Sequence, residues 1–475
     1  MKSESIRKIN KQPVGSDKNS SPVRRGEKYR LSITGLGHSG EGVGRIQDFT
    51  IFVPEALPGE TIEVMIEEVK KTYARGKISQ IVDPSEARCQ PPCAVYDQCG
   101  GCQLQHLNYP GQLAAKRQLV LDAVTRIGKL TDVTVHPTLG ADSPWYYRNK
   151  MQSPVGLSAG EIAVGCFAQG THDIIDSSSC HIQHHTNNLI AATVKQIILN
   201  FGISVYNERL HQGTIRHILG RVGTASGEVM VVLVTATREL PHANEIVSRL
   251  RQAIPGLVSV VHNVNDRQTN IILGDYTKTI WGKDTILDSL DGLSFRISAK
   301  SFFQVNTEQA AVLYRQAVKY ACLSGRETVL DLYCGTGTIA LFLARHCRKV
   351  IGIEIVAPAI ADAKQNAELN GITNADFICG DAVDMLPKLV ADGVQPDVVV
   401  IDPPRAGCER KVLEVIATLQ PERVVYVSCN PASLARDLAI LGENGYLTKE
   451  IQPVDMFPQT YHVECCVWLK RKHSP

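Results

Sequence analysis

The chain of 475 residues has no apolar run long enough to cross a membrane, and no apolar segment follows Met1. A membrane-spanning helix needs about 20 consecutive apolar residues, so the first absence excludes one. The second argues against a secretory signal, and we expect a cytoplasmic protein. The net charge is also small, at +2. Hydrophobic residues make up 44% of the chain and charged residues 21%. This composition is typical of a soluble globular protein, and the length predicts two or three domains.

The small net charge hides a basic N-terminal segment. The first 30 residues contain nine Lys or Arg but three Asp or Glu, and they are rich in Ser, Asn and Gln. We interpret residues 1–21 as a disordered basic arm, for which a polyanion is the expected partner.

Residues 22–83 have the pattern of a small β-barrel, because short alternating strands are separated by glycine turns. Gly-Glu-Gly-Val-Gly-Arg at 40–45, followed by Phe-Val-Pro-x-Ala-x-Pro-Gly-Glu at 52–60, resembles the TRAM domain, an RNA-binding barrel. The side chains expected to contact phosphates are Lys70, Lys71, Arg75 and Lys77.

Cysteines are numerous, at 14, in a chain for which we expect no export. Cys93, Cys99 and Cys102 form a Cys-x5-Cys-x2-Cys motif, which indicates a metal centre that is either a zinc site or an iron–sulfur cluster. Either centre needs a fourth ligand, for which we choose Cys180, with Cys89 and Cys166 as alternatives. The motif opens a region, residues 84–296, that we predict to be α+β and that carries no catalytic motif.

Residues 329–340 predict a buried strand, a glycine turn and the start of a helix. Gly335 and Gly337 allow the backbone to approach a ligand, and a second strand ends at Glu354, the spacing of a nucleoside-binding unit. No Gly-Lys-Ser/Thr follows, which argues against a nucleotide P-loop, whereas an NAD site also fits. Alternating strands and helices over residues 297–475 predict a doubly wound parallel sheet with acidic strand ends, and this pattern resembles S-adenosylmethionine-dependent methyltransferases.

The ends of the fourth and fifth strands of this sheet indicate the chemistry. Asp402-Pro-Pro-Arg405 lacks the aromatic residue with which amino-group methyltransferases stack a base, and a thiol, Cys429, follows the next strand. C5 of uracil is a poor nucleophile, but thiolate addition at C6 activates it. A base must then remove the C5 proton, and Glu464 on the last predicted strand is our choice.

Together, six motifs resemble the RNA uracil-5-methyltransferase family: the three cysteines, Phe-Phe-Gln-Val-Asn (302–306), Asp-Leu-Tyr-Cys-Gly-x-Gly (331–337), Ile-Asp-Pro-Pro-Arg (401–405), Ser-Cys-Asn-Pro (428–431) and His-Val-Glu (462–464). The barrel and cysteine motif resemble its 23S ribosomal RNA members. The resemblance implies that S-adenosylmethionine is bound by Gln304, Tyr333, Glu354 and Asp402. It implies Cys429 as nucleophile, Glu464 as base, and a [4Fe-4S] cluster on Cys93, Cys99, Cys102 and Cys180.

The expected fold is thus an OB-like barrel, a central α+β domain and a Rossmann-like methyltransferase domain, in a protein that we expect to be monomeric. Two other functions remain open at this point: methylation of transfer RNA uracil, and an RNA-binding scaffold with an inactive methyltransferase domain.

Overall fold

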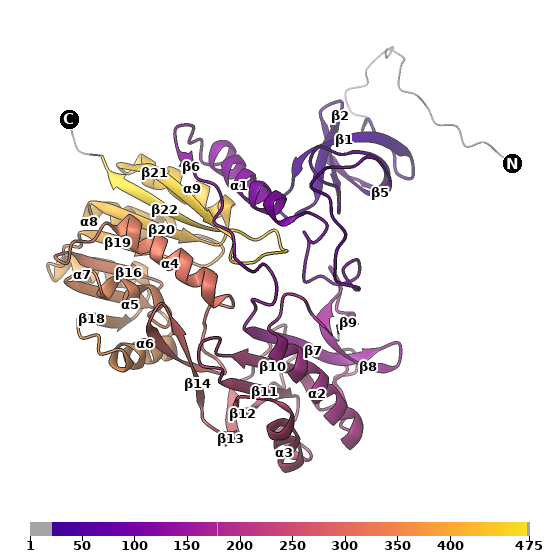
Figure 1. Cartoon of the computed structure of the whole chain (residues 1–475). Coiled ribbons are helices and arrows are strands. Elements are labelled where there is room, and N and C mark those ends of the chain that lie inside the picture. Colours follow the sequence, from indigo (N-terminus) through magenta and orange to yellow (C-terminus); the bar gives the residue numbers. More distant parts are fainter. Residues whose placement is uncertain (1–20, 178, 473–475) are drawn as a thin grey trace, which may run out of the picture. The chain divides into compact units, whose positions relative to one another are not determined.

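The computed structural model describes residues 21–177 and 179–472. The chain divides into two compact units, Met1–Glu86 and Ala87–Pro475 (Figure 1). The predicted basic arm lies outside the described residues, apart from Ser21. Within the described residues, every helix falls short of the length and apolarity that crossing a bilayer requires.

The first unit is a closed barrel with the strand order β1-β2-β3-β5-β4. Alternate side chains of each strand are buried, as in Leu31 and Ile33 of β1, and form the interior. Gly44 is required for closure, because a Cβ there would lie 2.5 Å from the carbonyl oxygen of Ser32. The strands are β1 (Lys28–Leu36), β2 (Gly42–Ile46), β3 (Phe49–Val53), β4 (Thr61–Val69) and β5 (Tyr73–Asp83). The predicted barrel is confirmed.

The second unit contains a mixed sheet with the strand order β13-β12-β11-β10-β7-β8-β9. One of its faces packs against α2 (His185–Phe201) and α3 (Ala243–Ala253), and the other joins the core around α4 (Thr307–Ala321). Burial on both faces explains the continuous apolar runs of β10 and β11. The strands are β7 (Lys150–Ser158), β8 (Glu161–Phe167), β9 (Ile174–Asp176), β10 (Ile215–Val222), β11 (Val229–Thr235), β12 (Leu257–Val264) and β13 (Tyr276–Gly282), followed by the hairpin β14 (Thr285–Leu290) and β15 (Leu293–Ser298).

The C-terminal part is a larger sheet, ordered β18-β17-β16-β19-β20-β22-β21-β6. Strands β16 to β20 are parallel, whereas β22 is antiparallel to both of its neighbours. The strands are β6 (Thr134–Val135), β16 (Thr328–Leu332), β17 (Lys349–Glu354), β18 (Ala375–Cys379), β19 (Val398–Ile401), β20 (Arg423–Ser428), β21 (Tyr446–Val454) and β22 (Glu464–Arg471).

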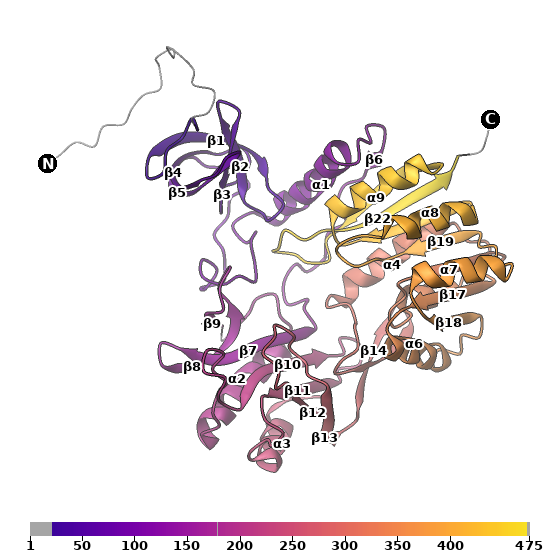
Figure 2. The ribbon, with the colours of Figure 1, turned by 180° about the vertical axis from the view of Figure 1, so that it is seen from behind.

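Helices cover both faces of this larger sheet (Figures 1 and 2). Val329 and Val350 face α4, α5 and α6, while Leu330 and Ile351 face α1, α7, α8 and α9. The helices are α1 (Tyr109–Arg126), α5 (Thr338–Ala344), α6 (Ala357–Leu369), α7 (Ala382–Ala391), α8 (Arg410–Leu419) and α9 (Pro431–Glu443). The predicted doubly wound fold class is confirmed, and the sheet also recruits α1 and β6 from the first part of the unit.

A buried ion pair fixes α1 to the C-terminal sheet. Lys116 of α1 donates to the carboxylate of Asp455, which follows β21, at 2.5 Å, and to the carbonyl oxygen of Phe457 at 3.0 Å. Both side chains of the ion pair are at most 1% exposed. Burial lowers the pKa of Lys116, and the charge of Asp455 opposes that shift. Neither member can therefore be removed without leaving its partner buried and unpaired.

We expect Asp455→Ala to lower the free energy of unfolding by about 3–5 kcal/mol, because it leaves the Lys116 ammonium buried without an anion. Urea unfolding followed by tryptophan fluorescence measures this, since Trp145, Trp281 and Trp468 all lie in the second unit. Lys195→Ala removes a partly exposed ion pair with Asp176 and should cost less than about 1 kcal/mol. Equal losses in the two variants would contradict the expectation.

Candidate active site

The predicted nucleophile and base meet because of the way β22 pairs with β20. Cys429 directly follows β20, and Glu464 is the first residue of β22. The antiparallel register sets Ser428 opposite Cys465, so the thiol and the carboxyl emerge side by side at the carboxyl edge of the parallel strands. Asp402 follows the neighbouring strand β19 and reaches the same edge.

Burial and mutual repulsion set the protonation of this group. Burial raises the pKa of Glu464 to about 8, and the charge of Asp402 contributes. Burial also raises the pKa of Asp402 to about 7. The pKa of Cys429 rises to about 11, chiefly through burial and then through Glu464 and Asp402, whereas Arg405 lowers it. The edge thus favours neutral groups, and a bound cation would favour their ionised forms.

The segment that joins β19 to α8 carries Asp402 and Arg405, and α9 holds its backbone. The carbonyl oxygen of Arg405 accepts hydrogen bonds from Asn430 Nδ2 at 3.0 Å and Ser433 Oγ at 3.1 Å. Since α9 begins two residues after Cys429, one helix fixes both the thiol and the Asp402 segment.

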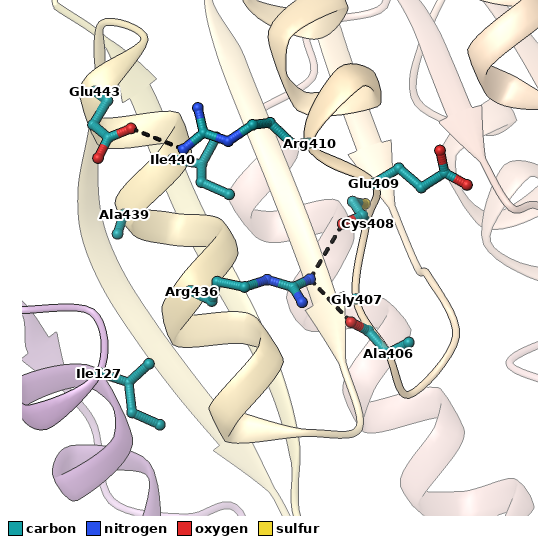
Figure 3. Close-up of a pocket in the computed structure, with 10 residues that line it drawn as sticks. All are labelled: Ile127, Ala406, Gly407, Cys408, Glu409, Arg410, Arg436, Ala439, Ile440 and Glu443. Atoms are coloured by element: carbon teal, nitrogen blue, oxygen red, sulfur yellow. Dashed lines mark hydrogen bonds and ion pairs between the residues drawn. The ribbon is translucent and has the colours of Figure 1, made fainter.

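Further along α9, Arg436 and the buried Asp437 hold the end of the same segment. Arg436 donates to the carbonyl oxygens of Ala406 at 2.9 Å and Cys408 at 3.2 Å (Figure 3). Asp437 accepts from the amide of Cys408 at 2.8 Å. Gly407 has a φ of 82°, and a Cβ there would lie 2.5 Å from both α9 side chains, so the close approach needs glycine.

A hollow of about 710 Å³ lies behind this segment, between α8 and α9. Ile127, Arg410 and Arg436 are among the residues of its wall, and Arg410 is paired with Glu443 across it (Figure 3). None of the predicted site residues belongs to that wall. We therefore place the site at the carboxyl edge of the sheet and not in this hollow.

The glycine turn and the second acidic strand end are in contact, as the sequence predicts for a nucleoside site. Glu354 accepts hydrogen bonds from the amides of Gly335 at 3.2 Å and Val356 at 2.9 Å. Tyr333 starts the turn with a φ of 63°, in the left-handed region that few non-glycine residues adopt. Such backbone strain is typical of functional sites.

Gln304 lies between the central sheet and α4. Its carbonyl oxygen accepts a hydrogen bond from Asn149 Nδ2 at 2.9 Å, and its side chain bonds the hydroxyl of Tyr314. Tyr314 is 3% exposed, and burial and then the charge of Asp402 raise its pKa well above the usual range, with a contribution from Glu464. The phenol therefore lies within electrostatic reach of the Asp402 and Glu464 carboxyls.

Sequence reasoning missed Tyr314 and His462. Tyr314 is one apolar-face residue among several on α4, and no local pattern separates it from the core. His462 belongs to the His-Val-Glu motif, and its place in that motif is the sequence feature that could have identified it. In the structure it lies near Arg405. Burial and then that cation lower the pKa of His462 to about 4, so its imidazole is neutral at pH 7.

Comparison with known proteins agrees with this geometry. Residues 223–472 match the family model described as tRNA (uracil-5-)-methyltransferase, and residues 22–79 match the TRAM domain. The chain belongs to the tRNA (uracil-5-)-methyltransferase family. The chain is also similar to RNA methyltransferases of Halalkalibacterium halodurans and Bacillus cereus, both named as uncharacterised. They are 48% and 49% identical to this chain over 96% of its length, and the matches cover 100% and 99% of theirs.

A solved member of this family has a similar structure. It is the Pyrococcus abyssi tRNA (uracil-54, C5)-methyltransferase in complex with S-adenosyl-L-homocysteine, with 31% identity and a TM-score of 0.73. The match covers 93% of this chain and 99% of that one. The chain is accordingly an S-adenosylmethionine-dependent RNA (uracil-5-)-methyltransferase, as the sequence predicts.

Five of the 14 cysteines, Cys93, Cys99, Cys102, Cys166 and Cys180, lie near one another. Cys102 neighbours Cys180, Cys99 and Cys93, and Cys166 hydrogen-bonds Cys99. Backbone amides point at two of the sulfurs: Gly101 N–H donates to Cys99, and Ile182 and Gln183 donate to Cys180. Among the described residues, no group of three or more His, Cys, Asp or Glu side chains is arranged to hold a metal ion.

We expect the alkylation of Cys429 by iodoacetamide to be slow at pH 7 and to accelerate with pH toward 11, because only the thiolate reacts. Glu464→Gln removes a charge that raises the Cys429 pKa, so above pH 8 this variant should react faster than the wild type.

At pH 7 the two rates should converge, because the Glu464 carboxyl is then protonated in the wild type. Peptide-resolved mass spectrometry measures the rates, with the exposed Glu422→Gln as control. A Glu464→Gln variant that reacts more slowly than the wild type above pH 8 would contradict the expectation.

Proposed function

We propose that the protein methylates C5 of a uridine in 23S ribosomal RNA, with S-adenosylmethionine as the methyl donor. The observation that carries this proposal is the adjacency of Cys429 and Glu464 at the carboxyl edge, with Asp402 beside them. A thiol and a carboxyl at one edge provide the nucleophile and the base that methylation at a pyrimidine carbon requires.

In the proposed reaction Cys429 first loses its proton to water, the thiolate sulfur bonds to C6 of the uracil, and the electrons of the C5–C6 double bond move to O4 as an enolate. The enolate carbon C5 then bonds to the methyl group, whose bond to the sulfonium breaks. Glu464 takes the C5 proton, the double bond re-forms, and the bond between C6 and the thiolate breaks. The positive sulfonium lowers the pKa of both Cys429 and Glu464 when it is bound, which favours the ionised forms that the reaction uses.

We assign cofactor binding to Gln304, Tyr333, Glu354 and Asp402. We assign the ribose hydroxyls to Glu354, and its hydrogen bond from the glycine turn supports this assignment. Asp402 offers a carboxyl next to the thiol, where the sulfonium must lie for transfer. S-adenosylmethionine supplies an electrophilic methyl group, and the protein supplies position and charge.

We assign RNA binding to the barrel, residues 22–83, and to the central domain, residues 84–296, and methyl transfer to residues 297–475. Lys70 and Lys77 pair with Glu68 and Glu67 at exposed positions. Such weak pairs can exchange their carboxylates for phosphates at little cost. A monomer in the cytoplasm fits this role.

Transfer RNA is the second candidate substrate, because the solved relative from Pyrococcus abyssi acts on tRNA uracil 54. We favour ribosomal RNA, because a barrel combined with a cysteine motif resembles the ribosomal RNA members of the family.

We propose a [4Fe-4S] cluster on Cys93, Cys99, Cys102 and Cys180, with zinc as the alternative. The chemistry of the donor set supports this proposal, although the described side chains are not themselves arranged to hold an ion: amides already point at Cys99 and Cys180, as they do toward ligating thiolates. Cys166 lies close enough to compete but receives no such amide in the described contacts. A cluster here would hold together segments that are distant in sequence.

The test incubates the protein with labelled S-adenosylmethionine and either 23S ribosomal RNA or transfer RNA, and maps 5-methyluridine. We expect label in the ribosomal RNA. Cys429→Ala should give no product, because C5 is then not activated. Glu464→Gln should accumulate RNA covalently bound to Cys429, because the C5 proton stays in place.

Label confined to transfer RNA would select the second candidate. An unchanged product yield with Cys429→Ala would exclude the proposed mechanism, and a wild-type protein inactive on both RNAs would favour the binding scaffold.

For the metal, we expect anaerobically purified protein to be brown and to contain about four iron atoms per chain, as a [4Fe-4S] cluster requires. Cys180→Ser should lose most of the iron, whereas Cys166→Ser should keep it, as measured by iron analysis and visible absorption. A colourless protein with stoichiometric zinc would exclude the cluster.

A further inference from the structure

The segment that precedes the proposed base is held by the loop that carries the cysteines. This segment, residues 455–463, joins β21 to β22, and we call it the base segment because Glu464 follows it directly. The carbonyl oxygen of Gln459 accepts hydrogen bonds from the amides of Gln103 and Leu104, both at 3.0 Å. These two amides follow Cys102 immediately, so backbone hydrogen bonds connect the cysteine loop to the base segment.

A buried glutamine pair reinforces this connection. The Gln112 side chain, on α1, accepts from the amide of Gln459 at 2.9 Å and donates to its Oε1 at 2.9 Å. The same Nε2 donates to the carbonyl oxygens of Leu104 at 3.1 Å and Leu107 at 2.8 Å. Gln112 is 1% exposed and Gln459 is 2% exposed. One side chain therefore joins the first turn of α1, the end of the cysteine loop and the base segment.

The backbone of Gln459 needs such support. Its φ is 71°, in the left-handed region that costs free energy for a residue with a Cβ. Both its amide and its carbonyl are bonded to groups outside its own segment. If those bonds were lost, the chain would relax toward a negative φ, and His462 and Glu464 lie three and five residues further on.

A second hydrogen bond holds the same segment. The hydroxyl of Tyr147 donates to the carbonyl oxygen of Pro458 at 3.0 Å. The base segment is thus held on consecutive residues, Pro458 by Tyr147 and Gln459 by the amides of the cysteine loop.

We propose that Gln112 is a positioning residue that transmits the order of the metal-bound cysteine loop to the base segment and so fixes Glu464 beside Cys429. This proposal rests on the proposed function, because it assigns a role to the metal and to the base. Under this proposal the metal has a structural role, which is to order the cysteine loop, in a reaction that has no redox step. The loop between Cys93 and Cys102 has no helix or strand of its own, and ligation would fix its shape.

The test compares Gln112→Leu with Gln118→Leu in the holoprotein. Gln118 lies on the same helix, is exposed, and bonds only Asp122 in the described contacts. We expect Gln112→Leu to accelerate hydrogen exchange across residues 456–463 and to lower kcat by about tenfold or more, because misplaced catalytic groups react slowly. KM for RNA and the metal content should stay within about twofold, as expected of a group outside the binding surfaces. Gln118→Leu should match the wild type.

Metal removal with a chelator provides the decisive comparison. In the wild type it should accelerate exchange both in residues 93–104 and in residues 456–463. In Gln112→Leu it should accelerate exchange in residues 93–104 and add little in residues 456–463, because the connection is already broken. Gln459→Met, which deletes one side-chain amide and leaves the backbone bonds, should show a smaller effect of the same sign and covers the case in which Gln112→Leu does not fold.

Two results would overturn the proposal. One is metal removal that loosens the cysteine loop and leaves residues 456–463 unchanged in the wild type. The other is a Gln112→Leu protein with faster exchange but an unchanged kcat. Hydrogen exchange does not depend on methylation. A protein inactive on both RNAs would therefore refute the proposed function, and the exchange rates of residues 456–463 would still test the link between the cysteine loop and the base segment.

Discussion

The antiparallel insertion of β22 between β20 and β21 is the constraint on which the site depends. It brings the last strand of the chain next to the strand that ends at Cys429, and its register leaves Glu464 at the same edge. A slip by one residue would turn the carboxyl to the opposite face of the sheet. The buried, hydrogen-bonded segment before β22 opposes such a slip.

The electrostatics of the edge follow from that arrangement. Three groups that ionise as anions lie together, with Glu464 buried and Cys429 and Asp402 half-buried. Burial raises the pKa of all three, and repulsion adds to the shifts of Cys429 and Glu464. An apolar or anionic ligand would leave them neutral. A cationic sulfonium is the kind of ligand that reverses the shift, and it does so only where its methyl group can reach the substrate. The charge and the position of the ligand are therefore selected by the same three groups.

The segments that hold the site residues in position come from two distant parts of the chain. Helix α9, which starts just after the thiol, holds the Asp402 segment through side chains spaced one turn apart. The cysteine loop and α1, more than 300 residues earlier, hold the base segment through Gln459. Because α1 is also locked by the Lys116–Asp455 pair, the first part of the second unit takes part in building the edge that carries the proposed site.

The amino-acid pattern alone determined the barrel, the parallel order of the C-terminal strands, and the chemical types of Cys429, Glu464 and Glu354, because strand periodicity, glycine turns and acidic strand ends are local signals. Tertiary structure decided the features that depend on contacts between distant segments, which local sequence signals do not encode. The placement of β22 and the recruitment of α1 and β6 depend on pairing between segments hundreds of residues apart. Tyr314, Gln112 and Gln459 look like ordinary helix or loop residues in sequence, and they acquire roles only because packing buries their polar groups against distant partners. The raised pKa values belong to the same class, because desolvation exists only once the sheet and its helices exclude water.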